Sequence, residues 1–240
     1  VLVAIHERRS IQFFDPQREV DPHLLRELLE TANLAPSSFN LQPWDVITLQ
    51  DRENKKKLRA CAFDQPKVEE AGAVLILVAN PRGVEEHIDP VLDRMIELGY
   101  LKPEAREKTR GMPFGLYGQD PDSVSRKLFA VKNAALFAMN LMVAARGYGL
   151  ETHPMDGFQE DKVKEAFGIP PGPTGAHAHR GGAPQAGDSA SAPGVSAPRG
   201  GLRPPRTLLT PPWTPSSASR ASWPSQAWSW RQPRGFSGRP

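Results

Sequence analysis

The stretch SVSRKLFAVKNAALFAMNLMVAA, residues 123–145, carries the clearest helical pattern in the chain. Its first residue, Ser123, has a hydroxyl oxygen that can accept a hydrogen bond from the first turn and so cap a helix. Apolar residues then recur at helical spacing: Val124, Leu128, Val131, Ala135, Ala138, Leu141, Met142 and Ala145. This pattern predicts a long helix that buries an apolar stripe in the core.

Shorter elements are predicted on both sides of this helix. The run AVLILVA, residues 73–79, is apolar throughout, which is typical of a strand buried on both faces. Asp21 and Pro22 suit the cap and the first position of an amphipathic helix. Further strands are expected near 46–49 and 150–153, and further helices over 1–9, after Asp51, over 84–99 and over 159–167. Residues 100–121 contain enough Gly and Pro to predict an irregular excursion.

The composition of the chain is that of a globular protein. Of its 240 residues, 39% are hydrophobic and 24% are charged. We find no run of about eighteen apolar residues, and the charges in VLVAIHERRS come too early for a secretory segment. These features predict a cytoplasmic protein without membrane spans. The single cysteine, Cys61, excludes an internal disulfide, and a buried structural thiol is favoured over a reactive one.

The C-terminal part has a different composition. Residues 173–240 contain eight of the 30 basic residues and one of the 27 acidic residues, which gives this segment a charge of +7 and residues 1–172 a charge of −4. The segment also holds 12 prolines and four of the five tryptophans. We therefore place a boundary at residue 172 and expect residues 173–240 to form a disordered, low-complexity tail.

Two motifs in the first part carry groups that could bind a ligand. Arg8, Arg9 and Ser10 stand at the end of a predicted helix, and guanidinium groups match the geometry of phosphate. The segment APSSFNLQPW, residues 35–44, places hydroxyl and amide groups between a helix and a strand. Taken alone, the first motif favours a solvated basic pair over a phosphate site, and the second favours a capped polar loop over a binding site. No metal-ligand spacing and no glycine-rich phosphate loop is found.

The order of several motifs is more specific. RRSIQFFDP, APSSFNLQPW, DQPKVEEAGAVLIL, the long helix and GLETHPMDGF follow one another in a way that resembles the bacterial nitroreductase family, over residues 1 to about 172. The resemblance implies an α+β fold of three layers, in which helices flank a mainly antiparallel sheet. It also implies an intertwined homodimer with FMN bound at the interface by both chains.

The resemblance further implies which residues bind FMN. They are Arg8, Arg9, Ser10 and Gln12; Pro36, Ser37, Ser38 and Asn40; Gln65 and Lys67; and Pro154, Met155, Asp156 and Gly157. The first group would meet the phosphate and ribityl chain, except that Gln12 stands near the pyrimidine edge, where many relatives have a cation. The second would come from the other subunit and line the flavin. Gln65 and Lys67 would reach the polar edge of the ring, and the last group would face N5 and the dimethylbenzene side.

The activity implied is an NAD(P)H-dependent flavin oxidoreductase reaction. NADH or NADPH would give hydride to flavin N5, and a nitroaromatic, quinone or similar flat acceptor would then be reduced in the same place. No side chain is nominated as a catalytic acid, base or nucleophile. His153, beside the predicted flavin loop, is the histidine closest to this chemistry.

The tail departs from the family. Relatives continue past a GIPPG-like turn with an apolar strand, an arginine near the flavin phosphate and an arm around the partner, whereas this chain reads PTGAHAHRGGAPQAG. We hypothesise that the tail is an out-of-frame translation and that the C-terminal strand and arm are missing. One alternative is a non-catalytic, FMN-deficient family member. Another, less favoured, is a basic tail that binds nucleic acid.

Overall fold

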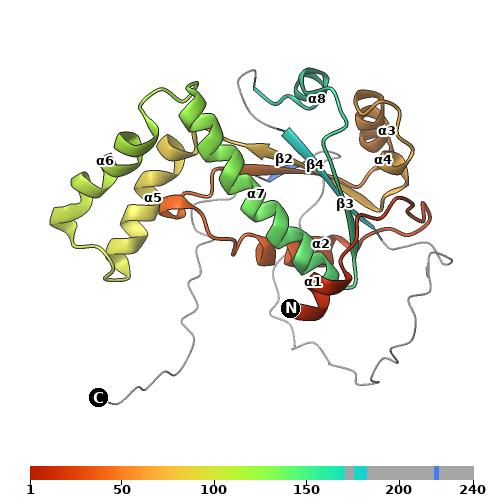
Figure 1. Ribbon diagram of the computed structural model, residues 1–240, viewed down its shortest axis with the longest axis horizontal. Coiled ribbons are helices and arrows are strands. Elements are labelled where there is room, and N and C mark those ends of the chain that lie inside the picture. The colour runs from red at the N-terminus through yellow and green to blue at the C-terminus, as the bar shows by residue number, and fades with distance from the viewer. Residues whose placement is uncertain (171–175, 183–218, 222–240) are drawn as a thin grey trace, which may run out of the picture.

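The computed structural model describes residues 1–170, 176–182 and 219–221. The elements are α1 (Leu2–Glu7), α2 (Pro22–Ala32), η1 (Ser38–Asn40), β1 (Trp44–Leu49), α3 (Arg52–Cys61), α4 (Lys67–Glu70), β2 (Ala73–Ala79), α5 (Gly83–Glu97), η2 (Pro103–Ala105), α6 (Arg106–Tyr117), α7 (Val124–Gly147), β3 (Glu151–Met155), α8 (Glu160–Phe167), β4 (Ala176–Gly182) and β5 (Ser219–Ala221). Figure 1 shows the sheet crossing the molecule, with α7 along one side of it and α3, α4 and α8 on the other. The predicted three-layer α+β arrangement is confirmed.

The described strands form one sheet in the order β3-β4-β2-β1-β5. Every pairing in it is antiparallel, and β1 and β2 pair along their whole facing length, from Trp44 opposite Ala79 to Leu49 opposite Val74. The predicted strand at 73–79 is confirmed, and all seven of its residues are buried. A strand that is covered on both faces has no need for polar residues, which explains its unbroken apolar run.

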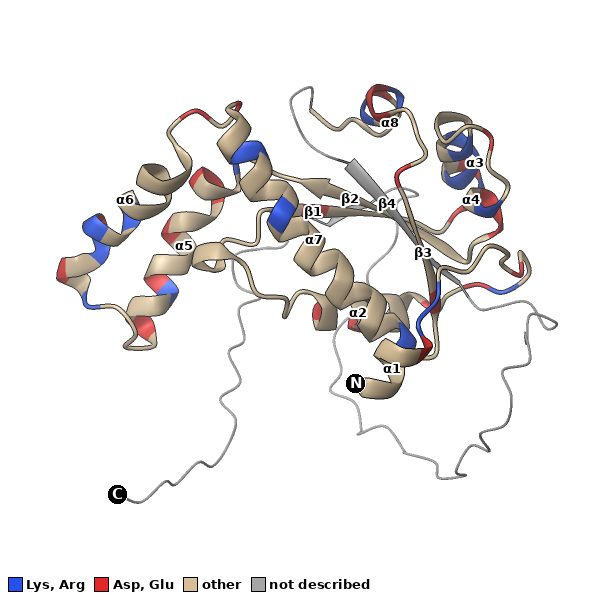
Figure 2. Ribbon diagram, viewed as in Figure 1, with Lys and Arg blue, Asp and Glu red and all other residues tan. Residues whose placement is uncertain are grey.

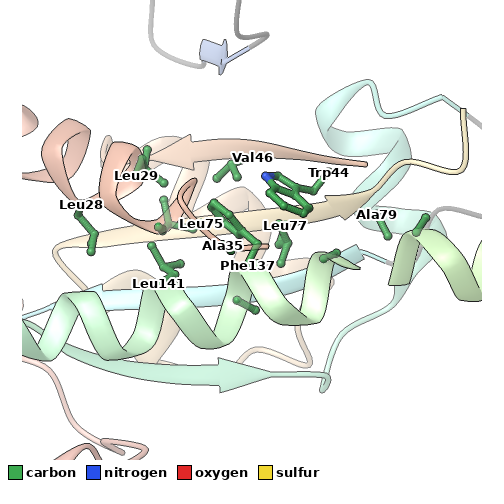
Figure 3. Close-up of a cluster of buried hydrophobic side chains, with 14 of the residues drawn as sticks. Leu28, Leu29, Ala35, Trp44, Val46, Leu75, Leu77, Ala79, Phe137 and Leu141 are labelled. Atoms are coloured by element: carbon green, nitrogen blue, oxygen red, sulfur yellow. The ribbon is translucent and has the colours of Figure 1, made fainter. Parts of the chain in front are cut away.

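The two faces of β2 belong to two different apolar clusters. Leu75 and Leu77 point toward α2 and α7 and join the larger cluster, in which Trp44 and Phe137 stack with ring centroids 5.2 Å apart (Figure 3). Val74 and Ile76 alternate with them and pack against α3, α4 and α8. The alternation follows from the two-residue period of a strand, and it leaves one helical layer on each face.

The stripe predicted on α7 is confirmed at Ala138, Leu141 and Ala145 and is wrong at its N-terminal end. The residues of α7 that are buried are Arg126, Phe129, Ala130, Asn133, Ala134, Phe137, Ala138, Leu141 and Ala145. Val124 and Leu128, which the pattern assigned to the core, are 68% and 64% exposed. The helix carries apolar residues on more than one side and no charge between positions 133 and 145 (Figure 2), so spacing alone could not identify the face that packs on the sheet.

The length and composition of α7 also bear on a second expectation, that the chain has no membrane span. Among the described residues, α7 is one helix that is long and apolar enough to cross a membrane. Its most apolar window of 18 residues has a mean hydropathy of 1.6. Half of that window is buried inside the molecule, where it covers the sheet. Core helices of large domains share this composition because they are packed against apolar neighbours on several sides.

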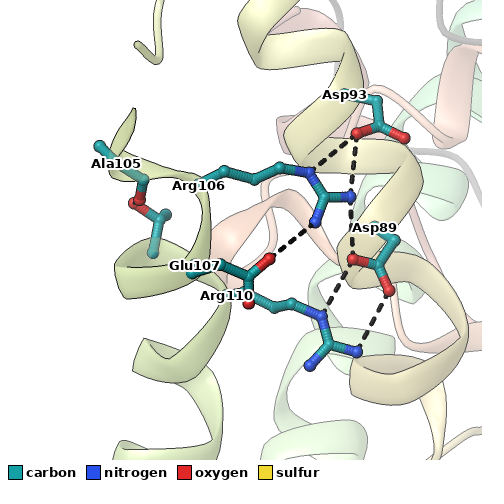
Figure 4. A network of polar contacts seen from close by, with 7 residues as sticks. Asp89, Asp93, Ala105, Arg106, Glu107 and Arg110 are labelled. Atoms are coloured by element: carbon teal, nitrogen blue, oxygen red, sulfur yellow. Dashed lines mark hydrogen bonds and ion pairs between the residues drawn. The ribbon is translucent and has the colours of Figure 1, made fainter. Parts of the chain in front are cut away.

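The segment expected to be irregular contains a regular helix, α6. Although Pro113 lies inside it, residues 106–117 are helical because ion pairs fix one of their faces to α5. Arg106 and Arg110, four residues apart, both reach Asp89 at 3.0 Å, and Arg106 also reaches Asp93 at 2.9 Å (Figure 4). Tertiary contacts have outweighed the low helix propensity of proline and glycine here.

Several predicted helix boundaries are confirmed by their caps. The carboxylate of Asp21 accepts a hydrogen bond from the His23 amide at 2.8 Å, and that of Asp51 accepts one from the Asn54 amide at 2.8 Å. Gly168 ends α8 with a φ of 63°, a conformation that glycine adopts without steric cost. Cys61 is buried at the end of α3, and burial raises the pKa of its thiol, which fits the structural interpretation.

The backbone after residue 172 differs from the expectation in one respect. The C-terminal strand was expected to be missing, yet residues 176–182 form β4, which pairs with β2 on one side and β3 on the other. Strand pairing uses backbone groups, so this position can be filled without the apolar side chains that the family pattern led us to expect. The proposed reading-frame change and the nucleic-acid alternative concern a tail that lies mostly outside the described residues.

Candidate functional site

The segment after α1 runs along the edge strand β3. Ser10 forms a bridge with Thr152, and the Ile11 amide donates to the Thr152 carbonyl oxygen at 3.2 Å. This pairing fixes the course of residues 8–12 beside β3, at the edge of the sheet. Arg9 folds back on α1 and donates to the carbonyl oxygen of His6 at 2.7 Å. Within the described part of the chain, the side chains of Arg8 and Arg9 form no ion pair with a carboxylate.

A three-residue ion cluster ties α1 to the rest of the molecule. Arg146, near the end of α7, donates to Glu7 of α1 at 2.7 Å and to Glu151 of β3 at 2.7 Å. Glu151 is buried, and this burial raises the pKa of its carboxyl, while Arg146 acts in the opposite direction. The cluster holds the last turn of α1, and therefore Arg8, next to the edge of the sheet.

Three of the predicted segments meet at this edge. The Lys67 ammonium donates to the Gln12 side-chain oxygen at 2.8 Å and lies 3.4 Å from Nε2 of His153. The Gln65 side-chain amide donates to the Gly157 carbonyl oxygen at 2.8 Å. These contacts join residues 8–12, 65–67 and 153–157 into one arrangement that carries an ammonium group and two carboxamides. We call this arrangement the sheet-side cluster.

The last of these segments is more regular than expected. Pro154 and Met155 form the end of β3, and Met155 is buried in the apolar cluster that packs against α3, α4 and α8. Asp156 and Gly157 follow as the loop, and only this part is free of strand pairing. Because β3 ends at Met155, the backbone of the loop that follows is held beside Gln65.

Residues 36–42 form a second cluster around an unusual backbone. Phe39, Asn40 and Gln42 have φ angles of 56°, 56° and 44°, in the left-handed region that residues other than glycine rarely adopt. The Ser38 amide donates to the side-chain oxygen of Asn133 on α7 at 2.9 Å. The hydroxyl oxygen of Ser37 accepts from the Gln42 amide at 2.9 Å. Such a backbone persists because surrounding groups hold it. We call residues 36–42 the polar loop.

The polar loop lies beside the start of α5 (Figure 1). His87 Nδ1 is 2.6 Å from the Leu41 carbonyl oxygen, and a Cβ on Gly83 would lie 2.8 Å from the Cα of Pro43. No hydrogen bond or ion pair among the described residues joins the loop to the sheet-side cluster. One chain thus brings together three of the four predicted segments, and the fourth stands apart on the far side of α7.

Three residues with a part in these clusters were missed by the sequence analysis. Arg146 anchors α1, while Lys132 and Asn133 bond Ser38, the lysine through the Ser38 hydroxyl at 3.2 Å. Asn133 could have been found, because it is a polar residue four positions from both Phe129 and Phe137 and so shares a helical face with apolar side chains. For Arg146 and Lys132 the sequence holds no comparable indication.

Comparison with known proteins gives a consistent result. The model of the nitroreductase family matches residues 5–179. A protein of Thermus thermophilus named NADH dehydrogenase is 36% identical over 169 residues, which cover 70% of this chain and 78% of the relative. YdgI of Bacillus subtilis, which carries the name of an NAD(P)H nitroreductase, is 31% identical over 163 residues, or 68% of this chain and 77% of that protein.

Solved structures agree with the sequence matches. A nitroreductase-type protein of Exiguobacterium sibiricum, crystallised in complex with FMN, superposes with a TM-score of 0.70 at 28% identity and covers 82% of this chain and 92% of its own. A nitroreductase-like protein of Streptococcus mutans superposes with a TM-score of 0.67 at 26% identity, covering 82% and 93%.

Proposed function

Because this chain belongs to the nitroreductase family of NAD(P)H-dependent flavin oxidoreductases, we propose that it binds FMN and transfers hydride from NADH or NADPH through flavin N5 to an electron-poor acceptor. Nitroaromatics, quinones and similar flat compounds are the acceptors we propose. FMN supplies the hydride chemistry when it is bound, so the protein needs to bind, orient and shield the reactants.

The sheet-side cluster is the observation that carries this proposal. Its donors match the groups of FMN that need them. The Lys67 ammonium donates to the Gln12 side-chain oxygen, and the Gln65 amide donates to the Gly157 carbonyl oxygen. These three polar side chains suit the polar edge of an isoalloxazine ring. Arg8 and Arg9 stand at the end of the same segment as Gln12, where two guanidinium groups suit a phosphate.

The remaining groups would shape the site. The hydroxyl of Ser10 would add a polar contact to the phosphate or ribityl chain. Pro154 and Met155 end a strand, and Asp156 and Gly157 follow it, so a backbone N–H of this segment can be held toward N5, where negative charge collects on reduced flavin. Pro36, Ser37, Ser38 and Asn40 would line the same flavin from another chain.

A homodimer follows from the separation of the two clusters. Since the polar loop stands apart from the sheet-side cluster of its own chain, we propose that it meets the cluster of a second copy. Exposed apolar residues on α1 and α7 support such an interface: Leu2, Val3, Ile5, Val124, Leu128, Leu136 and Met139. We place this enzyme in the cytoplasm.

The test is the flavin content of the purified full-length chain. We expect a yellow protein with FMN bound at about one molecule per chain, bleached anaerobically by NADH or NADPH and recoloured by a quinone or nitroaromatic. The mass in solution should be that of two chains. A colourless protein that takes up no added FMN would contradict the proposal and support the FMN-deficient alternative.

A further inference from the structure

We propose that Asn133 is a positioning residue, which holds the polar loop in the conformation needed to line the flavin. The proposal rests on the proposed function, because it takes residues 36–40 as part of the FMN site. Asn133 does not approach the sheet-side cluster, and we assign it no contact with the cofactor. Its role is exerted through one hydrogen bond to the loop backbone.

The surroundings of Asn133 support this assignment. Its side chain is completely buried on α7, within the apolar layer between the helix and the sheet. Its amide nitrogen donates to the Phe129 carbonyl oxygen at 2.7 Å, which fixes the orientation of the carboxamide. The side-chain oxygen is thereby directed outward to accept from the Ser38 amide at 2.9 Å. A buried amide is costly unless both of its ends are bonded, and here both are.

The contact falls where the loop most needs support. Ser38 is the first residue of η1, and Phe39 and Asn40 directly after it have φ angles of 56°. Two consecutive non-glycine residues in the left-handed region favour relaxation to an ordinary turn unless the backbone before them is held. The Asn133 bond holds this backbone from the core, while the Ser37 hydroxyl bonds Gln42 from within the loop.

Substitutions at position 133 can distinguish the loss of the hydrogen-bond acceptor from a change in side-chain volume. Leucine has nearly the shape of asparagine but leaves the Ser38 N–H without its partner. Aspartate keeps an oxygen that can accept from Ser38, but it replaces the nitrogen that donates to Phe129 with a second oxygen, so it restores only one of the two bonds. Asn140 is a matched control, because it is an asparagine on the same helix whose amide donates to Thr31 and Ala32 of α2, at 3.3 Å and 3.0 Å, and makes no bond to residues 36–42.

The experiment measures two quantities on the full-length chain and on the variants N133L, N133A, N133D and N140L. One is amide hydrogen exchange at Ser38 and its neighbours without flavin. The other is the dissociation constant of FMN, measured by quenching of flavin fluorescence. Thermal unfolding of each variant reports general loss of stability, so that variants of equal stability can be compared.

We expect the Ser38 amide to be protected in the wild type and to exchange at least tenfold faster in N133L and N133A. FMN should bind at least tenfold more weakly to these two variants than to N140L, and N133D, which keeps the acceptor for Ser38 and loses the donor to Phe129, should recover part of both losses. A Ser38 amide that exchanges freely in the wild type would overturn the proposal, even if neither Asn133 variant folds. Equal FMN affinities in N133L and N140L would also overturn it.

Failure of the proposed function gives a different pattern. If the wild type takes up no FMN, the affinity measurement has no wild-type value, and the FMN site itself is refuted. The assignment of Asn133 to the flavin is refuted with it, whereas the exchange measurement still decides whether Asn133 holds the loop.

Discussion

The sheet-side cluster and the polar loop are held in place by different kinds of interaction. In the first, charged side chains dominate: Lys67 bonds Gln12, and Arg146 ties α1 to Glu151. In the second, neutral groups hold the strained backbone through Asn133 and close packing on Gly83, while the Lys132 ammonium bonds the Ser38 side chain. The difference teaches that charge complementarity to an anionic cofactor and the shape of its binding surface can be assigned to separate parts of one chain. Each part can then be tested alone.

Removing the ammonium of Lys67 should have the largest effect on cofactor binding. K67M removes the ammonium that donates to the Gln12 side-chain oxygen and leaves Arg8 and Arg9 in place. A hydrogen bond to a charged group contributes about 2 kcal/mol, so FMN should bind between about tenfold and hundredfold more weakly. Fluorescence titration measures this, with K56M on the exposed side of α3 as the control. Equal affinities for the two variants would remove Lys67 from the site.

A methyl group on Gly83 should affect the polar loop and leave the sheet-side cluster unchanged. In G83A the new Cβ would lie 2.8 Å from both Cα and Cβ of Pro43, which is too close for either to remain where it is. Overpacking of this kind costs about 1–3 kcal/mol. Thermal unfolding gives the loss of stability, and hydrogen exchange shows whether it is centred on residues 36–43. G111A is the control, since nothing lies within 4 Å of a Cβ at that position on α6.

Removing the Arg146 side chain should weaken FMN binding less than removing that of Lys67 does. It should lower the free energy of unfolding more. R146M leaves the buried Glu151 carboxylate without its counter-ion. Because Arg146 is 29% exposed, water screens part of the loss, and we expect destabilisation of about 1–2 kcal/mol. Urea unfolding at neutral pH measures it, and R94M, which removes a surface pair with Glu97, should cost less. Since Glu151 has a raised pKa, lowering the pH should reduce the effect of R146M.

Much of the fold could be predicted from local patterns, and the reasons are physical. Residues 73–79 were found as a buried strand because burial on both faces excludes polar residues from it. The caps Asp21 and Asp51 were found because unpaired amides at a helix start require an acceptor. The packed face of α7 was found only in part, at Ala138, Leu141 and Ala145, because several faces of that helix are apolar and only the sheet decides among them.

The candidate site was predictable in its parts and not in its connections. Family motifs nominated Gln12 and Lys67 separately, and they meet where the Ser10–Thr152 bridge places residues 10–12 beside β3, a pairing that no local pattern encodes. The same holds for α6, whose helix depends on ion pairs with a neighbouring element. Contacts between residues far apart in sequence require the folded chain, which is why Arg146 and Lys132 were missed.

The smallest expected effect concerns the helices beside the polar loop. Arg110 and Arg106 bond the Asp89 carboxylate and lower its pKa below the ordinary aspartate value. A lowered pKa means that the stabilisation is complete above that ordinary value and is lost as the pH falls through the lowered pKa. Because the Asp89 side chain is 40% exposed, we expect D89N to cost less than about 1 kcal/mol at neutral pH.

The D89N variant also tests whether the polar loop and the sheet-side cluster are independent. Helix α5 carries Gly83 and His87, which contact the loop region. In D89N, hydrogen exchange at neutral pH should rise in α6 and remain unchanged in residues 8–12, and the pH dependence of unfolding below the ordinary aspartate pKa should become shallower. If exchange rose equally beside Lys67, the two clusters would share one cooperative unit. Their assignment to separate sets of interactions would then fail, because loosening one helix pair would have loosened both.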